Sequence, residues 1–410
     1  MDNHPPVFDG TGTPIMFETL ERLPADPILG LSVACAADPN PDKVDLTVGV
    51  YKDSSGLTPV FSAVSRAQEA LTENEVTKAY IPQAGDPDYL SGIRTLLLGE
   101  GHAALADNRV ACVQAPGGCG ALRIGAELVK AARTNARVWI STPTWPNHIP
   151  LVGSVGLEFK EYRYYDPQAH GVDFSGMMED LSGAEAGDVV LLHGCCHNPC
   201  GADLNPEQWR ELTALVRECG VTPFIDIAYQ GMGAGLDEDA YGLRLMASEV
   251  PELLIAASNS KNMGLYRERT GAMVFVGRDS EAADIITSQG TRAARKIYSM
   301  PPAHGAILAG MVLSDSTLSA SWREELDVMC TRINGLRDML ADKLQAATAA
   351  DFEFIRKENG MFSFLGLSQE QVNRLREEFS VYMIGSSRIN VAGVNESNVD
   401  YVAGAVAKVL

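Results

Sequence analysis

Short runs of β-branched and other apolar residues alternate with amphipathic segments through the middle of the chain. The runs predict strands at Arg137–Ser141, Asp188–His193, Thr222–Ala228, Leu253–Ala257 and Ala272–Val276. Between two of them, apolar positions recur with helical spacing over Gln208–Cys219. This helix has Asn205 as its N-cap and Pro206 in its first turn, and it ends at Gly220. Strands that alternate with helices predict a mostly parallel sheet covered on both faces.

The pattern changes near residue 325. A long helical pattern covers Trp322–Ala346, and the apolar run Met361–Leu367 predicts a short strand. Ser368 and Gln371 form a capping box that opens a helix to about Phe379. We therefore expect a separate, smaller α+β unit at the C-terminal end. Residues 1–15, rich in Pro, Gly and Asp, are expected to be a flexible leader.

Composition narrows the range of functions. The 410 residues carry a formal net charge of −20, which argues against a nucleic acid or an anionic membrane as partner. A small anionic substrate stays compatible, because a few buried arginines can set the local field. The eight cysteines show no regular spacing and predict reduced thiols in a cytoplasmic protein. Neither a signal peptide nor a membrane-spanning run of about 18 apolar residues is expected.

A lysine stands in the segment SNSKNMGLYRERTG, between two predicted strands. A lysine in a loop is usually a solvated charge. Lys261, however, lies between two apolar strands, and a lysine at such a place can lose basicity and act as a nucleophile. Ser258, Ser260 and Arg269 are suited to bind a phosphate, the arginine through a bidentate fork.

A glycine-rich turn opens a predicted helix in QAPGGCGALRIGAELVKAA, residues 114–132. The free N–H groups of a helix N-terminus make an anion site, and glycines let a phosphate approach the backbone. The signal is weak by itself, since many such turns carry glycine for their geometry.

An acidic residue ends the apolar strand FIDIAYQG. Asp226 needs a partner there, or its burial is costly, and a cationic pyridinium nitrogen would be one. Tyr229, past the strand end, could donate to a ring substituent. The alternative is an N-cap aspartate and a packing tyrosine.

Histidines and cysteines gather between His193 and Cys200, in HGCCHNPC. Their spacing matches no usual structural zinc pattern, so no metal site is expected. Asn-Pro before Gly fits a tight turn that presents Asn198 to a ligand. Two arginines, Arg388 in SSRINVAG and Arg295 in RKIYSMPP, are either structural ion-pair partners or carboxylate clamps for a dicarboxylic acid.

Together these segments resemble the class I aspartate/aromatic aminotransferases of pyridoxal-phosphate (PLP) fold type I, and among them bacterial aspartate aminotransferases. The resemblance covers Met16 to Leu410 and rests on ADPILGL, VGVYKD, STPTWPNH, HGCCHNP, FIDIAYQG, SNSKNMGLYRERTG, YSMPP, NGMFSF and SRINVAG. It implies an α/β fold, with a large PLP-binding domain of residues 59–325 around a mostly parallel mixed sheet. Residues 16–58 with 326–410 would form the smaller α+β domain.

The resemblance also implies a role for each site residue. Lys261 would form a Schiff base with PLP and then move the proton. Asp226 would keep the pyridine nitrogen protonated, supported by His148 and His193, while Tyr229 and Asn198 bond the phenolate oxygen and Trp145 stacks on the ring. The phosphate would be held by Gly118, Cys119, Ser258 and Arg269, with Tyr80 from the second subunit of a homodimer. Arg388, close to Gly49 and Asn198, would bind the substrate α-carboxylate, and Arg295 from the partner its side-chain carboxylate.

The implied reaction is ping-pong transamination between aspartate or glutamate and a 2-oxo acid such as 2-oxoglutarate; the alternative is a broad aromatic aminotransferase. Cys119 stands where the bacterial family has the threonine of GGTG, so we expect looser phosphate binding. Met300 precedes Pro-Pro where the family has Asn or Ser, which favours apolar substrates. Val50, Lys52 and Thr58 follow the aspartate-type pattern.

Three other functions have less support in the sequence. A PLP-binding transcription regulator would need a winged-helix segment and a basic face, which neither the first 60 residues nor the charge provides. A zinc-stabilised structural protein would depend on the His193–Cys200 segment. β-Elimination or decarboxylation on PLP would not explain the paired arginines.

Overall fold

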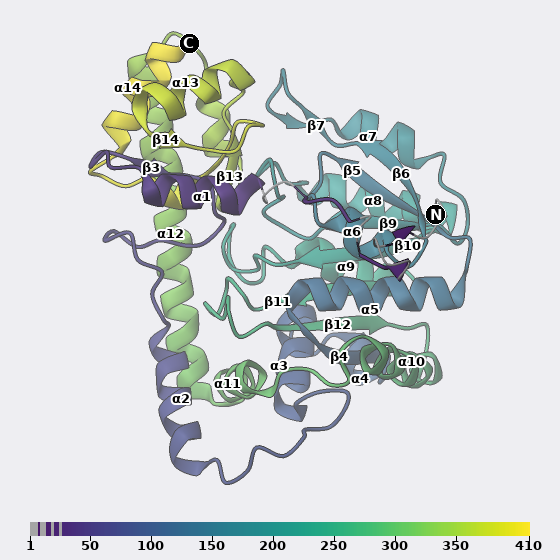
Figure 1. The fold of residues 1–410 in the computed structure, drawn as a ribbon. Helices are drawn as coiled ribbons and strands as arrows, with labels where there is room; N and C mark the ends of the chain where they lie inside the picture. Colours follow the sequence, from purple (N-terminus) through teal and green to yellow (C-terminus); the bar gives the residue numbers. More distant parts are fainter. Residues whose placement is uncertain (1–6, 9–13, 18–19, 24–26) are drawn as a thin grey trace.

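A seven-stranded mixed sheet forms the centre of the protein (Figure 1). The computed structural model describes residues 7–8, 14–17, 20–23 and 27–410. The strand order is β4-β12-β11-β10-β9-β5-β6, and β11, β10, β9, β5 and β6 run parallel. In that order the strands are Val110–Pro116, Thr270–Val276, Leu253–Ser258, Thr222–Ile227, Val189–His193, Arg137–Thr142 and Glu158–Arg163.

Fourteen helices surround this sheet and build the C-terminal part of the described chain. They are α1 (Pro27–Ala37), α2 (Ser62–Asn74), α3 (Pro87–Leu98), α4 (Ala103–Ala106), α5 (Gly117–Ala132), α6 (His148–Gly153), α7 (Phe174–Leu181), α8 (Pro206–Cys219), α9 (Tyr241–Glu249), α10 (Ser280–Tyr298), α11 (Ala303–Ser314), α12 (Ser316–Ala347), α13 (Gln369–Phe379) and α14 (Val399–Val409).

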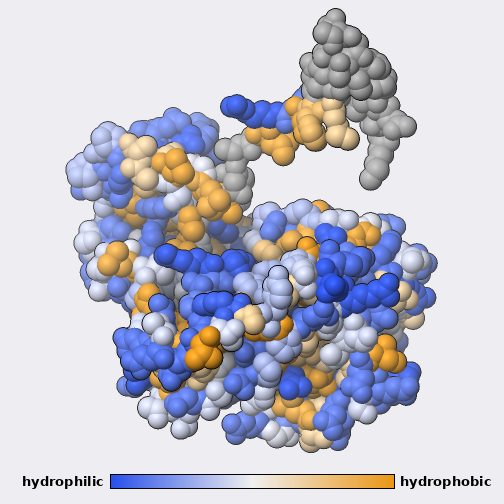
Figure 2. Space-filling model, turned by 60° about the horizontal axis from the view of Figure 1, so that its bottom comes forward, coloured by the Kyte–Doolittle hydropathy of each residue, from blue (hydrophilic) through white to orange (hydrophobic). Residues whose placement is uncertain are grey.

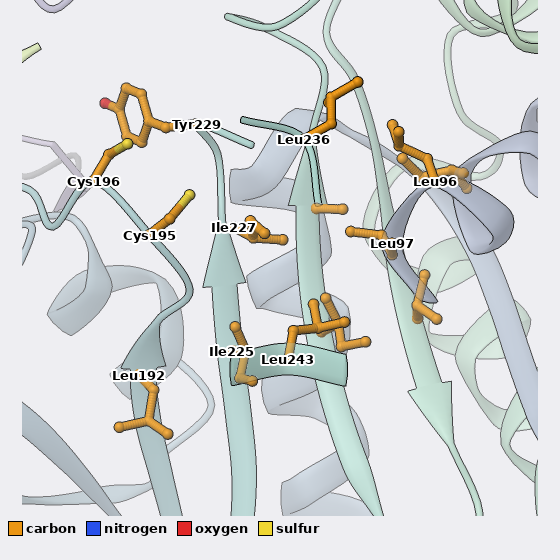
Figure 3. Close-up of a cluster of buried hydrophobic side chains, with 14 of the residues drawn as sticks. Leu96, Leu97, Leu192, Cys195, Cys196, Ile225, Ile227, Tyr229, Leu236 and Leu243 are labelled. Carbon is orange, nitrogen blue, oxygen red and sulfur yellow. The ribbon is translucent and has the colours of Figure 1, made fainter. Parts of the chain in front are cut away.

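Alternate residues of the central strands enter two different apolar cores. In β10, Phe224 faces a core formed with α5 and α10, whereas Ile225 and Ile227 face the opposite core, formed with α3, α8 and α9. Figure 3 shows part of the second core, which includes Leu192, Ile225 and Ile227 of the strands, Leu96 and Leu97 of α3, and Leu243 of α9. Because both faces are covered there, the central strands β10, β11 and β12 are almost wholly buried, whereas the edge strand β6 is mostly exposed.

A further apolar core lies in the C-terminal part. It joins Val44 and Leu46 to residues of α12, α13 and α14. Figure 1 shows α12 extending from the level of α11 to this part of the molecule. Two short pairings complete it: β13 (Phe362–Phe364) with β15 (Arg388–Asn390), antiparallel, and β14 (Val381–Tyr382) with β3 (Val44–Asp45), parallel.

The predicted elements are confirmed with small shifts of their ends. Helix α8 has the Asn205 N-cap, here in a capping box with Gln208, and Gly220 is left-handed at its C-cap. The capping box of Ser368 and Gln371 is also present. Helix α12 begins six residues before the expected start, because Asp315 caps it by accepting from the Thr317 and Leu318 N–H groups.

One expectation needs correction. The strand expected over Met361–Leu367 is limited to Phe362–Phe364, since its partner β15 has only three residues. Strand β12 begins at Thr270 rather than Ala272 and is antiparallel to both neighbours. Of the expected leader, Val7–Phe8 pairs with Pro14–Ile15, and its other residues lie outside the described ones. None of the described helices is both long and apolar enough to cross a membrane.

Candidate active site

The carboxyl ends of β9, β10 and β11 meet at a cavity of about 470 Å³. Ligands of open α/β sheets bind at this edge, because loops and helix N-termini converge there. The predicted site residues that line it are Gly49, Gly118, Cys119, Trp145, His193, Asn198, Asp226, Tyr229, Ser258, Lys261, Arg269 and Arg388. The fold thus brings together segments that lie more than 300 residues apart in the sequence.

Lys261 reaches this cavity from the loop that follows β11. Trp322 of α12 fixes the loop by donating to the Asn262 carbonyl at 2.6 Å. The Lys261 ammonium lies 4.5 Å from the centre of the Tyr229 ring. Desolvation lowers the pKa of Lys261 to about 8, against the opposing attraction of Asp226. A substantial fraction of this amine is therefore neutral, and nucleophilic, near neutral pH.

Asp226 is buried in the penultimate position of β10 and bonds to His148, whose Nε2 lies 2.9 Å from the Asp226 carboxylate. Because a carboxylate only accepts, His148 Nε2 donates, and the other ring nitrogen, His148 Nδ1, lies 2.8 Å from Thr144 Oγ1. Burial alone would raise the pKa of Asp226, but the His148 hydrogen bond and nearby positive charge hold it below its usual value. The site thus keeps a buried anion ready for a cationic partner.

The chain of hydrogen bonds continues from Thr144 to His193, whose Nε2 lies 3.2 Å from Thr144 Oγ1. Desolvation lowers the pKa of His193 to about 3, so this ring is a neutral imidazole. His193 and His148 therefore support Asp226 as hydrogen-bonded partners in series, the arrangement that the resemblance implied.

An anion site forms where α5 begins. Gly117 has a φ of +69°, and a Cβ there would lie 2.5 Å from Nη2 of Arg269. The first turn of the helix and the guanidinium can approach so closely only because this residue is glycine. Arg269 Nη1 also donates to Ser260 Oγ at 3.3 Å, and Ser260 in turn bonds to Ser258. Helix N–H groups, hydroxyls and a cation converge here, which suits a phosphate.

Cys119 lies in this first turn of α5 and lines the cavity. Its sulfur lies 3.8 Å from the Asn147 amide nitrogen. Burial raises the pKa of the Cys119 thiol despite the nearby Arg269, so the thiol is protonated and a weak donor at neutral pH. Cys119 therefore lies at the cavity end where the first turn of α5 begins.

Arg388 occupies the other end of the cavity, buried at 4% exposure. Its Nη1 donates to Asn198 Oδ1 at 3.1 Å and its Nη2 to the Thr47 carbonyl at 2.8 Å. The guanidinium also stacks 4.4 Å from the centre of the Phe362 ring. Among the described residues it has no carboxylate partner, and its buried Nε has no hydrogen bond. A buried cation in this state suits an anionic ligand.

Several lining residues were given no role in the sequence analysis: Ile28, Leu29, Val48, Ala228, Tyr266 and Phe362. Tyr266 accepts from the Tyr51 backbone N–H at 3.0 Å, which joins the early segment to the loop after Lys261. Burial raises the pKa of Tyr266 to about 12 and also raises that of Tyr229. Both phenols are therefore protonated donors. The six lining residues without an earlier role stand within the motifs that carry the resemblance, and only this position could have indicated them.

Three predicted site residues do not line this cavity: His148, which contacts it through Asp226, and also Tyr80 and Arg295. Tyr80 is 91% exposed, and Arg295 is exposed in the last turn of α10. Met300, which follows that helix, is partly buried and does not line the cavity either.

The cluster that raised the zinc alternative separates in the structure. Among the described residues, the one group of three potential ligands close enough to share a metal is Cys195, Cys196 and Asp239, which includes no histidine. Both oxygens of Asp239 already accept backbone N–H groups, those of Gly231, Gly233 and Ala234. His197 instead bonds to Ser141 and Cys200.

The fold and the site together identify the class of protein: the chain belongs to the aminotransferase class I and II family, whose model matches residues 41–406. It is 48% identical to the aspartate aminotransferase of Escherichia coli K12 and 44% identical to the aromatic-amino-acid aminotransferase of Paracoccus denitrificans. Each alignment covers 96% of this chain and all of the relative. The structure resembles that of a Burkholderia pseudomallei aromatic-amino-acid aminotransferase covalently bound to pyridoxal phosphate. The TM-score is 0.95 at 42% identity, over 97% of this chain and 100% of the other.

Proposed function

We propose that this protein is a PLP-dependent aminotransferase that exchanges the amino group of aspartate or glutamate with a 2-oxo acid such as 2-oxoglutarate. The observation that carries the proposal is the pairing, in one cavity, of a lysine of lowered pKa with a buried carboxylate, between an anion site and an unpaired buried arginine. The anion site at the start of α5 suits the phosphate of the cofactor, and Arg388 at the other end suits a carboxylate of the substrate.

The residues present fit PLP. The glycine-rich start of α5, Ser258 and Arg269 would hold its phosphate. A Cβ added at position 117 would clash with the Arg269 guanidinium at this place. Asp226 would hold a proton on its ring nitrogen, with His148 and His193 in series behind it. Tyr229 and Asn198 would donate to its phenolic oxygen, and Trp145 would cover one face.

Bound PLP supplies an aldehyde carbon that takes up the amino group and a ring that withdraws electrons from the substrate Cα. The chain supplies the proton chemistry and the orientation. Lys261 Nζ, whose lowered pKa raises its neutral fraction near neutral pH, would take the proton from the substrate Cα and deliver it to the carbon of the cofactor aldehyde. Arg388 would fix the α-carboxylate beside Gly49 and Asn198, and so orient the C–H bond that breaks.

The proposed substrates include a second class, the aromatic amino acids. Aspartate and aromatic aminotransferases are similarly close relatives of this chain. Ile28, Leu29, Val48 and Phe362 give the cavity an apolar wall, which favours tolerance of aromatic side chains. We propose dicarboxylic acids as the preferred substrates and tyrosine and phenylalanine as alternatives, because Arg295 suits a side-chain carboxylate.

We further propose a homodimer with shared active sites. Tyr80 and Arg295 are exposed in the single protomer, and Leu57, Val60 and Val76 are exposed apolar residues of the segment that leads to Tyr80. Figure 2 shows, on one face of the molecule, apolar patches that interrupt a hydrophilic surface. A partner would cover such residues and receive Tyr80 and Arg295 at its own cavity.

The homodimer proposal is tested by mixing two inactive variants. Lys261→Ala and Arg295→Ala subunits should regain aspartate turnover on mixing, because one hybrid site then holds both native residues. Mixed subunits no more active than the separate variants would contradict shared sites.

We also propose that residues 16–58 and 326–410 form a small domain and residues 59–325 the large one. The separate apolar core that joins Val44 and Leu46 to the C-terminal helices supports this division. Limited proteolysis tests it: cuts should concentrate in the exposed segment of residues 54–58, because the other boundary lies inside helix α12, where Leu326 is buried, and cuts spread evenly over the chain would contradict it.

The main proposal is tested by borohydride reduction of the PLP-loaded protein followed by peptide mass spectrometry. We expect a covalent adduct on the peptide that contains Lys261, and transamination of aspartate with 2-oxoglutarate in the unreduced protein. Lys261→Ala should lose both while keeping the circular dichroism of the wild type, and Lys160→Ala, on the exposed strand β6, should keep both. Absence of the adduct and of turnover would overturn the proposal.

A further inference from the structure

Two charged residues outside the cavity, the partly buried Asp203 and the buried Arg337, hold the loops that shape its Arg388 end. One loop, residues 194–205, joins β9 to α8 and carries Asn198. The other, residues 358–361, leads into β13 and Phe362. Asn198 and Phe362 both contact the Arg388 guanidinium, at 3.1 Å and 4.4 Å. The position of these two loops therefore sets the orientation of the Arg388 guanidinium in the cavity.

Asp203 closes the first loop. Its Oδ2 accepts from the Cys196 N–H at 2.7 Å and its Oδ1 from the His197 N–H at 2.9 Å, the two residues directly before Asn198. Cys196 has a φ of +51°, a left-handed conformation that a non-glycine residue adopts at a cost. The Asp203 carboxylate offsets this cost by satisfying both N–H groups. Figure 3 shows Cys196 next to Tyr229, beyond the strand that carries Leu192.

Arg337 of α12 fixes the second loop and is 1% exposed. Its Nη2 donates to the carbonyls of Gly360 at 2.7 Å and Phe362 at 2.5 Å, and its Nη1 forms an ion pair with Glu358 at 3.1 Å. Arg337 thus orders the backbone on both sides of the segment that places the Phe362 ring under Arg388.

The two loops are also joined to each other. The Asn359 N–H donates to the Gly201 carbonyl at 2.7 Å, and the Gly201 N–H donates to the His197 carbonyl at 2.7 Å. A Cβ at Gly201 would lie 2.4 Å from the Phe362 carbonyl oxygen. The loops therefore meet at van der Waals distance and form one support around Arg388.

We propose that Asp203 and Arg337 are positioning residues, which hold Asn198 and Phe362 against Arg388 and so set the affinity of the site for a substrate carboxylate. This inference depends on the proposed function, in which Arg388 binds that carboxylate. Neither residue lines the cavity, so each acts through the loop that it orders.

The test is Asp203→Asn, which keeps size but places an amide group opposite the two N–H donors. We expect the KM for aspartate and the inhibition constant of maleate, a dicarboxylate that does not react, to rise about tenfold, as for one weakened charge-assisted hydrogen bond. The kcat should change by less than about threefold, and PLP content should stay at the wild-type level.

Asp188→Asn is the matched control. Asp188 is also a buried carboxylate that accepts hydrogen bonds, from Arg137 and Trp139, but it lies at the opposite end of β9. Its variant should lose stability without any change in KM. An unchanged KM in folded Asp203→Asn, or an equal rise in Asp188→Asn, would overturn the inference.

Arg337→Lys provides a second variant and should raise the same two constants. If neither Asp203→Asn nor Arg337→Lys gives folded holoenzyme, the residues serve folding rather than positioning, and the inference is wrong. A wild-type protein that does not transaminate would instead overturn the proposed function, so the two failures are distinct.

Discussion

Replacing Arg388 by lysine keeps the positive charge at the buried end of the cavity but removes the planar fork. In the wild type, Asn198 and Thr47 hold Nη1 and Nη2 at 3.1 and 2.8 Å, and the Nε–H has no hydrogen-bond partner within the described part of the chain. The guanidinium is therefore oriented before a ligand arrives, and N–H groups are left to bind a carboxylate in bidentate fashion. A flexible ammonium group would make one such hydrogen bond and lose the stacking on Phe362.

The expected loss follows from these contacts. One hydrogen bond to a charged group contributes about 1.5–3 kcal/mol. At about 1.4 kcal/mol for each factor of ten, the kcat/KM for aspartate should fall by about 10- to 150-fold in Arg388→Lys. The inhibition constant of maleate should rise by a similar factor, because the contact binds the ground state as well.

Steady-state kinetics with aspartate and 2-oxoglutarate measure this loss, together with maleate inhibition and PLP content. Arg374→Lys is the control, since Arg374 is exposed on α13 and pairs only with Glu378 at 2.8 Å and the Lys408 carbonyl at 3.3 Å among the described residues. A decrease smaller than about threefold in Arg388→Lys would refute the bidentate argument. So would a decrease fully explained by lost PLP, because it would place Arg388 at the cofactor.

Three more predictions follow from the same site. Uptake of PLP by the apoprotein should accelerate as the pH rises through about 8 and then level off. The reason is that the pKa of Lys261 is about 8 and only its neutral amine attacks the PLP aldehyde. A rate that levels off only above a pH of about 10 would show that Lys261 is an ordinary lysine. Cys119→Thr should slow PLP dissociation, because a hydroxyl is a better donor than the protonated thiol, and an unchanged dissociation rate would show that this position contributes little to phosphate affinity. Arg295→Ala should lower kcat/KM for aspartate far more than for phenylalanine, because the loss of a buried charge pair costs about 2–5 kcal/mol. Equal losses for the two substrates would show that Arg295 has a structural role.

Much of the site could be predicted because its residues stand in short, characteristic segments. Lys261, Asp226 and Asn198 each follow or end an apolar strand, and parallel strands bring their carboxyl ends to one edge. The glycine-rich start of α5 was a weaker signal, because many such turns carry glycine for their geometry. Tyr266 and Phe362 were missed, because a single aromatic residue in a loop or short strand has the same local pattern whether it lines a cavity or fills a core.

The sequence by itself determined the local elements, since caps and periodicity act over a few residues. The capping boxes at Asn205 and Ser368 and the alternating apolar strands are of this kind. Only the tertiary structure decided that β12 runs antiparallel to its neighbours, and that Asp203 and Arg337 hold two loops around Arg388. These contacts form when distant segments pack together, so no local pattern records them.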